Sequence, residues 1–313
     1  MAAILVVVLG ASEVYSQEYP VRPIRIVTSA PGGGRDFVAR LIAQGISDRL
    51  GKRVIVDNRG GAVLMAEIVS NATPDGYTFL IAASTLWIGP LLQKMPYDVD
   101  RDFAPVTFTD KSPGIMAVHP TLPVPIKSVR EFIALAKARP GQLNYSSSAP
   151  GSSSHLAAEL FKMMAGVDLV RVSYKGSGPS VLAVMQGEVQ VIINTGSSIE
   201  PHARSGRLRA LAVTSLDPSR LFPDLPTVAA SGVPGYEFVT SGIMVAPAKT
   251  PAAVIRRVNQ EVVRYLNTSE AKEKFLVQGV EPYGSSPKEL DRVLKAERAM
   301  WAKVIKHAGI VAK

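Results

Sequence analysis

Segments typical of a strand and segments typical of a helix alternate along this chain, and that order restricts its fold more than any other feature. The run IRIVT (24–28) predicts a strand, and the apolar residues that follow it fall on one face of a helix over 36–50. A second strand is predicted over 53–57, a helix over 62–71 and a third strand within 74–83. Strands joined by helical crossovers form a parallel sheet, so the sequence predicts an α/β fold.

The same alternation starts again beyond residue 120 and indicates a second α/β unit. Its expected strands are LNYSS (143–147), LVRVSY (169–174), VQVIIN (189–194) and LRALAVTS (208–215). Its expected helices are SVREFIALAKARPG (128–141) and three more that begin near Ser153, Pro179 and Ser197. From Pro251 onward the sequence predicts mostly helix, and we expect this tail to pack back on the first unit.

Two short runs, GIMAVHP (114–120) and SGIMVAP (241–247), stand where the chain would pass between the two units. They share the pattern G-I-M, which fits a pair of similar hinge strands. We therefore predict two lobes, of which lobe 1 contains 17–117 and 243–313 and lobe 2 contains 118–242. A cleft between two lobes is the natural ligand site.

The first twenty residues, MAAILVVVLGASEVYSQEYP, join an apolar stretch to small and polar residues. Val14 and Ser16 have the spacing that a signal peptidase prefers, so we expect a signal peptide over 1–16 and a mature protein exported to the periplasm. The basic residues that usually precede such a stretch are missing, so the alternatives are a natural start further upstream or a buried first strand. No later segment has the length of a transmembrane helix.

Composition excludes several classes of function. The chain contains no cysteine, which excludes disulfides, thiolate catalysis and Cys-ligated metals. Its net charge of +9 comes from 35 Lys and Arg against 26 Asp and Glu, which are dispersed, so we expect no nucleic-acid partner. No H-E-x-x-H motif or carboxylate cluster indicates a metal, and we expect no cofactor. A positive field would still draw small anions toward a cleft.

The stretch TSAPGGGRDF (28–37) places three glycines between the first strand and the first helix. A dinucleotide site needs G-x-G-x-x-G, and a P-loop needs Lys-Ser or Lys-Thr after its last glycine. Arg35 and Asp36 follow the glycines here, so both nucleotide interpretations fail. Glycines let bare N–H groups approach a ligand, and a helix N-terminus favours negative charge. An anion site and a turn that binds nothing are the two alternatives that stay open.

The stretch NYSSSAPGSSSHLAAELF (144–161) repeats this arrangement in the second unit, because Gly151, Ser152 and Ser153 precede a predicted helix. Two such helix N-termini on opposite sides of a cleft would clamp a carboxylate without a salt bridge. The alternative is a flexible serine-rich loop that binds nothing. His155 beside the serines could indicate a hydrolase, but no G-x-S-x-G motif is present, and local packing is the simpler role.

A third junction, SYKGSGPS (173–180), again exposes amides at a helix start. Lys175 within it is either a ligand contact or a solvated charge at the rim. The strand VQVIIN delivers Asn194 and Thr195 to its carboxyl end, where α/β folds place their ligands.

Seven segments occur in the following order: YPVRPIRIVTSAPGGGRDFVARLIA, VIVDNR, PDGYTFLIA, MPYDVDRDFAPVT, LNYSSSAPGSSSHLAAELFKMMAGVDLVRVSYKG, GRLRALAVTS and FPDLPTVAASGVPGYE. In that order, from about Tyr19 to Gly309, the chain resembles the substrate-binding receptors of the tripartite tricarboxylate transporter family, the Bug-type periplasmic proteins. The resemblance implies a two-lobed α/β Venus flytrap of the periplasmic binding protein type II kind. It implies a non-enzymatic receptor that binds a small organic carboxylate and hands it to the membrane permease subunits of the transporter, and we expect a monomer.

The resemblance also implies a set of ligand-binding residues, with the carboxylate held by loop amides, hydroxyls and bridging waters. In lobe 1 they are Ala30, Pro31, Gly32, Gly33, Gly34, Arg35, Asp36 and Ser84, and in lobe 2 Ser148, Ala149, Gly151, Ser152, Ser153 and Asn194.

Departures from the family pattern occur at three places near this expected pocket. Arg35 stands where the family usually has a small hydroxyl residue, and Ala30 where it has a proline. GGAVLMAE follows DNR in place of a longer glycine-rich stretch, and Ser241 and Gly242 replace a common aromatic pair. We therefore weigh two roles for Arg35: a bidentate contact to a second carboxylate of the ligand, or a solvent-facing position at the rim. A sensor with the same pocket and, in another class, a serine hydrolase are the alternative functions.

Overall fold

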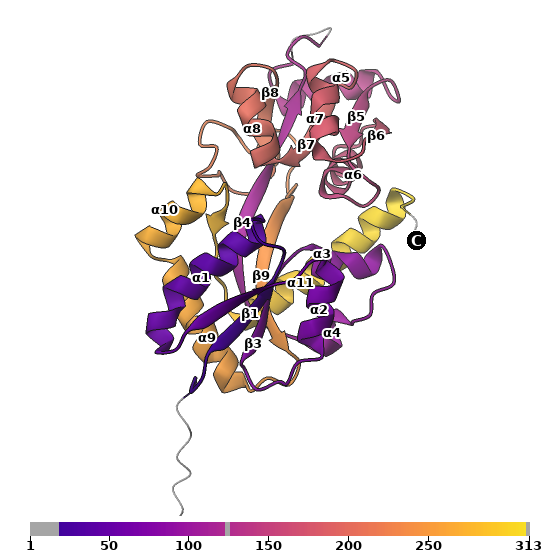
Figure 1. Ribbon diagram of the computed structural model, residues 1–313. Helices are drawn as coiled ribbons and strands as arrows, with labels where there is room; N and C mark the ends of the chain where they lie inside the picture. The colour runs from indigo at the N-terminus through magenta and orange to yellow at the C-terminus, as the bar shows by residue number, and fades with distance from the viewer. Residues whose placement is uncertain (1–18, 123–125, 311–313) are drawn as a thin grey trace, which may run out of the picture.

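The computed structural model of the protein describes residues 19–122 and 126–310, which form two lobes (Figure 1). The predicted signal peptide, 1–16, lies outside the described residues. Strands and helices follow the predicted alternation in both lobes, so the α/β prediction is confirmed.

The first lobe is built on a sheet in which β1 (Ile24–Thr28) pairs in parallel with β2 (Val54–Asn58) and β3 (Thr78–Ala83). The crossovers are α1 (Gly34–Leu50) and α2 (Ala62–Ser70), within a few residues of the predicted helices. Three short helices that were not predicted follow β3: α3 (Thr85–Ile88), the 3-10 helix η1 (Gly89–Leu91) and α4 (Val99–Asp102).

The second lobe repeats this construction. β5 (Asn144–Ser147) pairs in parallel with β6 (Val170–Ser173) and β7 (Val191–Thr195), while β8 (Arg209–Val213) pairs antiparallel with a strand that comes from the first lobe. Its helices are α5 (Val129–Ala138), α6 (Ser153–Ala165), α7 (Ser177–Met185) and α8 (Gly196–Arg204).

Two long antiparallel strands connect the lobes, β4 (Phe103–Val118) and β9 (Val239–Pro247) (Figure 1). β4 pairs with β9 from Phe103 to Pro113, and from Gly114 onward it pairs with β7 and β8 of the second lobe. One strand therefore belongs to both sheets. The sequence predicted the crossings at 114–120 and 241–247 but not the earlier half of β4. The lobe boundaries at 117/118 and 242/243 stay a prediction, and the partners of β4 change slightly before the first of them.

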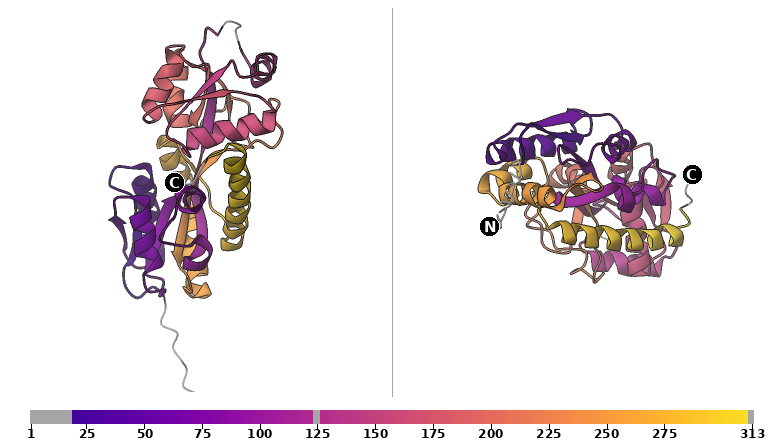
Figure 2. Two further views of the ribbon diagram at one scale, coloured as in Figure 1. Left: turned by 90° about the vertical axis from the view of Figure 1, so that its right-hand side faces the viewer. Right: turned by 90° about the horizontal axis from the view of Figure 1, so that it is seen from below.

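The tail consists of α9 (Ala252–Leu266), α10 (Ser269–Val277), the short strand β10 (Glu281–Pro282) and α11 (Pro287–His307). α9 packs on α1 of the first lobe, as expected. α11 lies against β4 but also against α6 of the second lobe, and its end reaches the junction of the two lobes (Figure 2). Trp301 of α11 packs edge-on against Phe238, at the entry to β9. The tail thus forms a third contact between the lobes.

The packing of α9 on α1 makes one glycine critical. A Cβ at Gly45, in the middle of α1, would collide with the ring of Tyr265 on α9. Gly→Ala inside a helix ordinarily stabilises by about 1 kcal/mol. We expect Gly45→Ala to lower the free energy of unfolding by about 1–3 kcal/mol instead, because the core is overpacked. Urea denaturation will measure it, with the exposed Gln44→Ala as control. Equal destabilisation in a Tyr265→Ala background would contradict the prediction.

Candidate functional site

The loop before α1 is shaped by Asp36, which points inward. Its carboxylate accepts hydrogen bonds from the N–H of Gly32 (2.9 Å) and from Asn58 Nδ2 (2.7 Å), and it pairs with Arg40 (2.9 Å). Burial raises the pKa of this carboxyl, but the hydrogen bonds from Asn58 and Gly32 outweigh burial, and the pKa lies below its usual value. Asp36 therefore holds the loop rather than offering free oxygens to a ligand. Gly32 has φ +82°, a conformation that few other residues adopt.

The first turn of α1 offers free backbone donors. Gly33 is the N-cap, and its carbonyl accepts from Phe37 N. Within the described part of the chain, the N–H groups of Gly34, Arg35 and Asp36 meet no acceptor, as the first N–H groups of a helix do when nothing caps them. Ala30 and Pro31 are exposed beside them. These three donors form the lobe 1 side of the candidate site.

Arg35 is paired within the protein rather than turned to solvent. Its Nη1 and Nη2 donate to the two carboxylate oxygens of Asp110 on β4, at 2.7 and 2.5 Å. Its side chain is only 17% exposed, and that of Asp110 is fully buried. The solvent-facing position is therefore wrong, and the end of the guanidinium that would grip a carboxylate already holds one from the protein.

The start of α6 forms the lobe 2 side. Ser152 is the N-cap, and its Oγ accepts from His155 N at 3.4 Å. The Gly151 N–H donates to His155 Nδ1 (3.0 Å) and the Ser148 N–H to Ser154 Oγ (3.0 Å), so these two predicted donors are already used. The N–H groups of Ser153 and Ser154 have no acceptor among the described residues.

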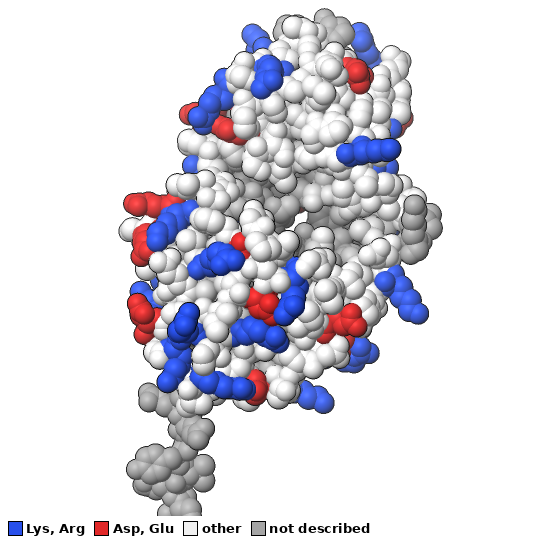
Figure 3. Space-filling model, viewed as in Figure 1, with Lys and Arg blue, Asp and Glu red and all other residues white. Residues whose placement is uncertain are grey.

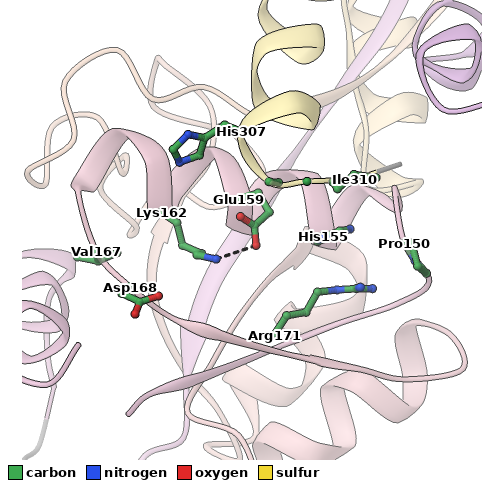
Figure 4. Close-up of a pocket in the computed structure, with 11 residues that line it drawn as sticks. Pro150, His155, Glu159, Lys162, Val167, Asp168, Arg171, His307 and Ile310 are labelled. Atoms are coloured by element: carbon green, nitrogen blue, oxygen red, sulfur yellow. Dashed lines mark hydrogen bonds and ion pairs between the residues drawn. The ribbon is translucent and has the colours of Figure 1, made fainter. Parts of the chain in front are cut away.

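Two residues that the sequence did not single out for this purpose hold the 147–151 loop. Arg171 on β6 donates to Ser147 Oγ and to the Ser148 carbonyl oxygen, both at 2.7 Å. His155 holds Gly151 from the other side, and both side chains line a cavity of about 670 Å³ behind the loop (Figure 4). Burial, followed by the nearby Arg171 charge, lowers the pKa of His155 to about 4, so its ring is neutral near pH 7. The loop is thus held by hydrogen bonds from within its own lobe.

Asn194 is buried in a polar network at the starts of α7 and α8. Its Nδ2 donates to Ser177 Oγ (2.7 Å), and its Oδ1 accepts from the Thr195 N–H (2.8 Å). Ser177 and Thr195 both contact Ser198 through their hydroxyls. A ligand would meet the hydroxyls of this network more readily than Asn194 itself, which is 5% exposed.

The two lobes meet beside the start of α6. A Cβ at Gly151 would lie 2.8 Å from Leu92 Cδ1 of the first lobe, and both lobes line a cavity of about 450 Å³ that includes Ala149, Val63 and Gly89. Ser84 instead lines a different cavity, of about 360 Å³, between the lobes and α11. Ser84 therefore shares no cavity with Ala149 of the second lobe.

The surface between the lobes is hollowed, and acidic and basic side chains are interspersed over the rest of this face (Figure 3). Among residues 19–122 and 126–310, no group of three or more His, Asp or Glu could hold a metal ion. Over the same residues, every helix is too short or too polar to cross a membrane.

Comparison with known proteins identifies relatives over nearly the whole chain. The sequence model of the tripartite tricarboxylate transporter family receptor matches residues 38–310. Protein BugT of Bordetella pertussis is 36% identical over 307 residues, which cover 96% of this chain and 93% of that protein.

Two solved structures carry bound acids. Rpa4515 of R. palustris with adipate is 37% identical, with a TM-score of 0.72, and the match covers 94% of this chain and 99% of that one. MatC from Rhodopseudomonas palustris with bound malate is 27% identical, with a TM-score of 0.67, over 92% of this chain and 100% of that one. The predicted two-lobed type II fold is confirmed by these likenesses.

His155 makes stability depend on pH. The unfolded chain binds a proton at this residue below about pH 6.5, whereas the folded protein does so only below about pH 4. The free energy of unfolding therefore decreases as the pH is lowered from about 6.5 to about 4. The loss amounts to about 2–3 kcal/mol. In His155→Asn, the side-chain oxygen can replace Nδ1 as acceptor for Gly151 but does not titrate. Urea denaturation from pH 7 to 4.5 should therefore show a smaller loss in the variant than in the wild type, and parallel profiles would contradict this role.

Proposed function

Because this chain belongs to the tripartite tricarboxylate transporter family receptors, we propose that it is a periplasmic receptor that captures a small organic carboxylate and delivers it to the membrane permease subunits of such a transporter. The ligand class is a di- or tricarboxylate or an aromatic acid. Adipate and malate bound to two relatives support an aliphatic dicarboxylate first.

The observation that carries this proposal is the pair of helix starts, one in each lobe, whose first N–H groups have no acceptor among the described residues. Arg35 ties the start of α1 to a hinge strand, and Gly151 brings the start of α6 against Leu92 of the other lobe. N–H groups at a helix N-terminus favour an anion through geometry and through the helix dipole, and bridging waters extend their reach.

Closure of the two lobes would bring both sets of donors onto one carboxylate. The ligand favours the closed state only by the difference in its affinity for the closed and open states. β4 and β9 connect the lobes and provide the hinge for such a movement.

A thermal-shift screen tests the proposal. We expect adipate, malate or another small acid at millimolar concentration to raise the melting temperature, because a ligand that binds only the folded state stabilises it. The primary amides of the same acids are the controls for the carboxylate charge. Absence of a shift with dicarboxylates, tricarboxylates and aromatic acids alike would count against the proposal.

Proline substitutions at the first helical position can remove single donors. Gly34 and Ser153 follow N-caps with extended backbone, a conformation that accepts a following proline, and proline is favourable at this position. We expect Gly34→Pro and Ser153→Pro each to weaken carboxylate binding about tenfold, roughly the loss of one hydrogen bond to a charged group. Calorimetric titration will measure the dissociation constants.

A matched control exists on α10. Ser269 is exposed, occupies the same helical position after the extended N-cap Thr268, and belongs to the tail rather than to the site. Ser269→Pro should leave affinity unchanged. Ser153→Ala separates the hydroxyl of Ser153 from its N–H. If both site variants bound as tightly as Ser269→Pro, the amides would not be the ligand's partners.

A further inference from the structure

We propose that Arg35 is a positioning residue of the carboxylate site: its ion pair with Asp110 fixes the free N–H groups of α1 relative to the hinge strands. The inference rests on the proposed function. Arg35 lies in the same helical turn as the free N–H groups of Gly34 and Asp36. A shift of Asp110, which holds the Arg35 side chain, would therefore also shift these N–H groups.

The anchor itself is rigid. Asp110 is fully buried, pairs in register with Gly242 of β9, and accepts a further hydrogen bond from Thr109 Oγ1 at 2.7 Å. Both oxygens of the carboxylate are engaged by Arg35. A bidentate pair of this kind fixes orientation as well as distance. The start of α1 is therefore tied to the two strands about which the lobes would move.

Gly242 makes room for the pair. A Cβ at this position would collide with Arg35 Nη1, Asp110 Oδ1 and Thr109 Oγ1. The guanidinium thus occupies the space in which a side chain of β9 would stand. The two sequence departures noted at Arg35 and Gly242 are in contact and form one arrangement.

The pair also explains why Arg35 does not serve as the ligand's charge partner. Its positive charge is balanced by Asp110 inside the protein, and Nη1 and Nη2 both donate to it. Recognition of the ligand carboxylate is left to the backbone donors, which are the same whether the ligand carries one carboxylate or two. A positioning role and a direct contact therefore predict different selectivities.

Three variants disturb the pair in different ways. Arg35→Lys keeps the charge but loses the bidentate geometry, Asp110→Asn removes the buried charge, and Gly242→Ala displaces the guanidinium without changing any charge. Arg101→Lys is the matched control, because Arg101 makes a bidentate pair with Asp102 on the exposed helix α4. Calorimetric titration compares adipate with monomethyl adipate, which has lost one carboxylate charge at the same chain length.

We expect each of the three variants to weaken both ligands by the same factor, about tenfold, and Arg101→Lys to weaken neither. A loss confined to adipate would show that Arg35 contacts the second carboxylate and would overturn the proposal. If the variants had lower melting temperatures but unchanged dissociation constants, the ion pair would serve stability alone. That result would also overturn the proposal.

A measurement without ligand separates this proposal from the proposed function. In ¹H–¹⁵N spectra of the ligand-free protein, the Gly34 and Asp36 amide resonances should move in all three variants and stay in place in Arg101→Lys. If the wild type binds no carboxylate but these resonances move, the proposed function fails while the positioning of the amides stands. If they do not move, the positioning role is wrong whatever the ligand.

Discussion

The antiparallel pairing of β4 with β9 is the constraint on which the rest of this structure depends. Because β4 continues into the second sheet from Gly114 onward, the two lobes share one strand and its hydrogen bonds. Each hinge strand carries a glycine where another segment comes close: a Cβ at Gly114 would lie 2.7 Å from the Asn194 carbonyl oxygen, and one at Gly242 would collide with Arg35. The repeated G-I-M pattern thus marks two close approaches in the hinge, one on each side of it.

The two lobes place backbone donors at a helix start by different means. In the first lobe a glycine N-cap without a side chain leaves the donors bare, and Asp36 with Asn58 shapes the loop from below. In the second lobe a serine cap is combined with His155 and Arg171, which take up the loop's own polar groups. In both lobes neighbouring side chains hold the loop, and among the described residues the donors of the first helical turn are left without an acceptor.

Most of the longer elements of this fold could be predicted from the sequence because their signals are local: periodicity, caps and glycine or proline breaks. The first half of β4 could not, since DFAPVTFTDKSPG contains two prolines and a run of polar residues, and it becomes a strand through pairing with β9 and β10. The helix starts of the site were predicted for the same local reason. The sequence did not predict which N–H groups at these helix starts are free. That depends on contacts of His155, Arg171 and Asp110, which the sequence order does not reveal.

The Arg35–Asp110 ion pair fixes the position of the start of α1 more than it adds to the free energy of unfolding. A buried ion pair contributes little net stability, since desolvation offsets its attraction, yet losing one partner costs about 3–5 kcal/mol because a buried charge is left alone. Displacing α1 from the hinge strands would separate the charges and incur a similar penalty, so the start of α1 has one favoured position. A ligand closes such a receptor only through the difference in its affinity for the closed and open states. Donors that are already in position add to that affinity because no free energy is spent on ordering them. The pair holds the donors in position with groups that the ligand does not have to touch.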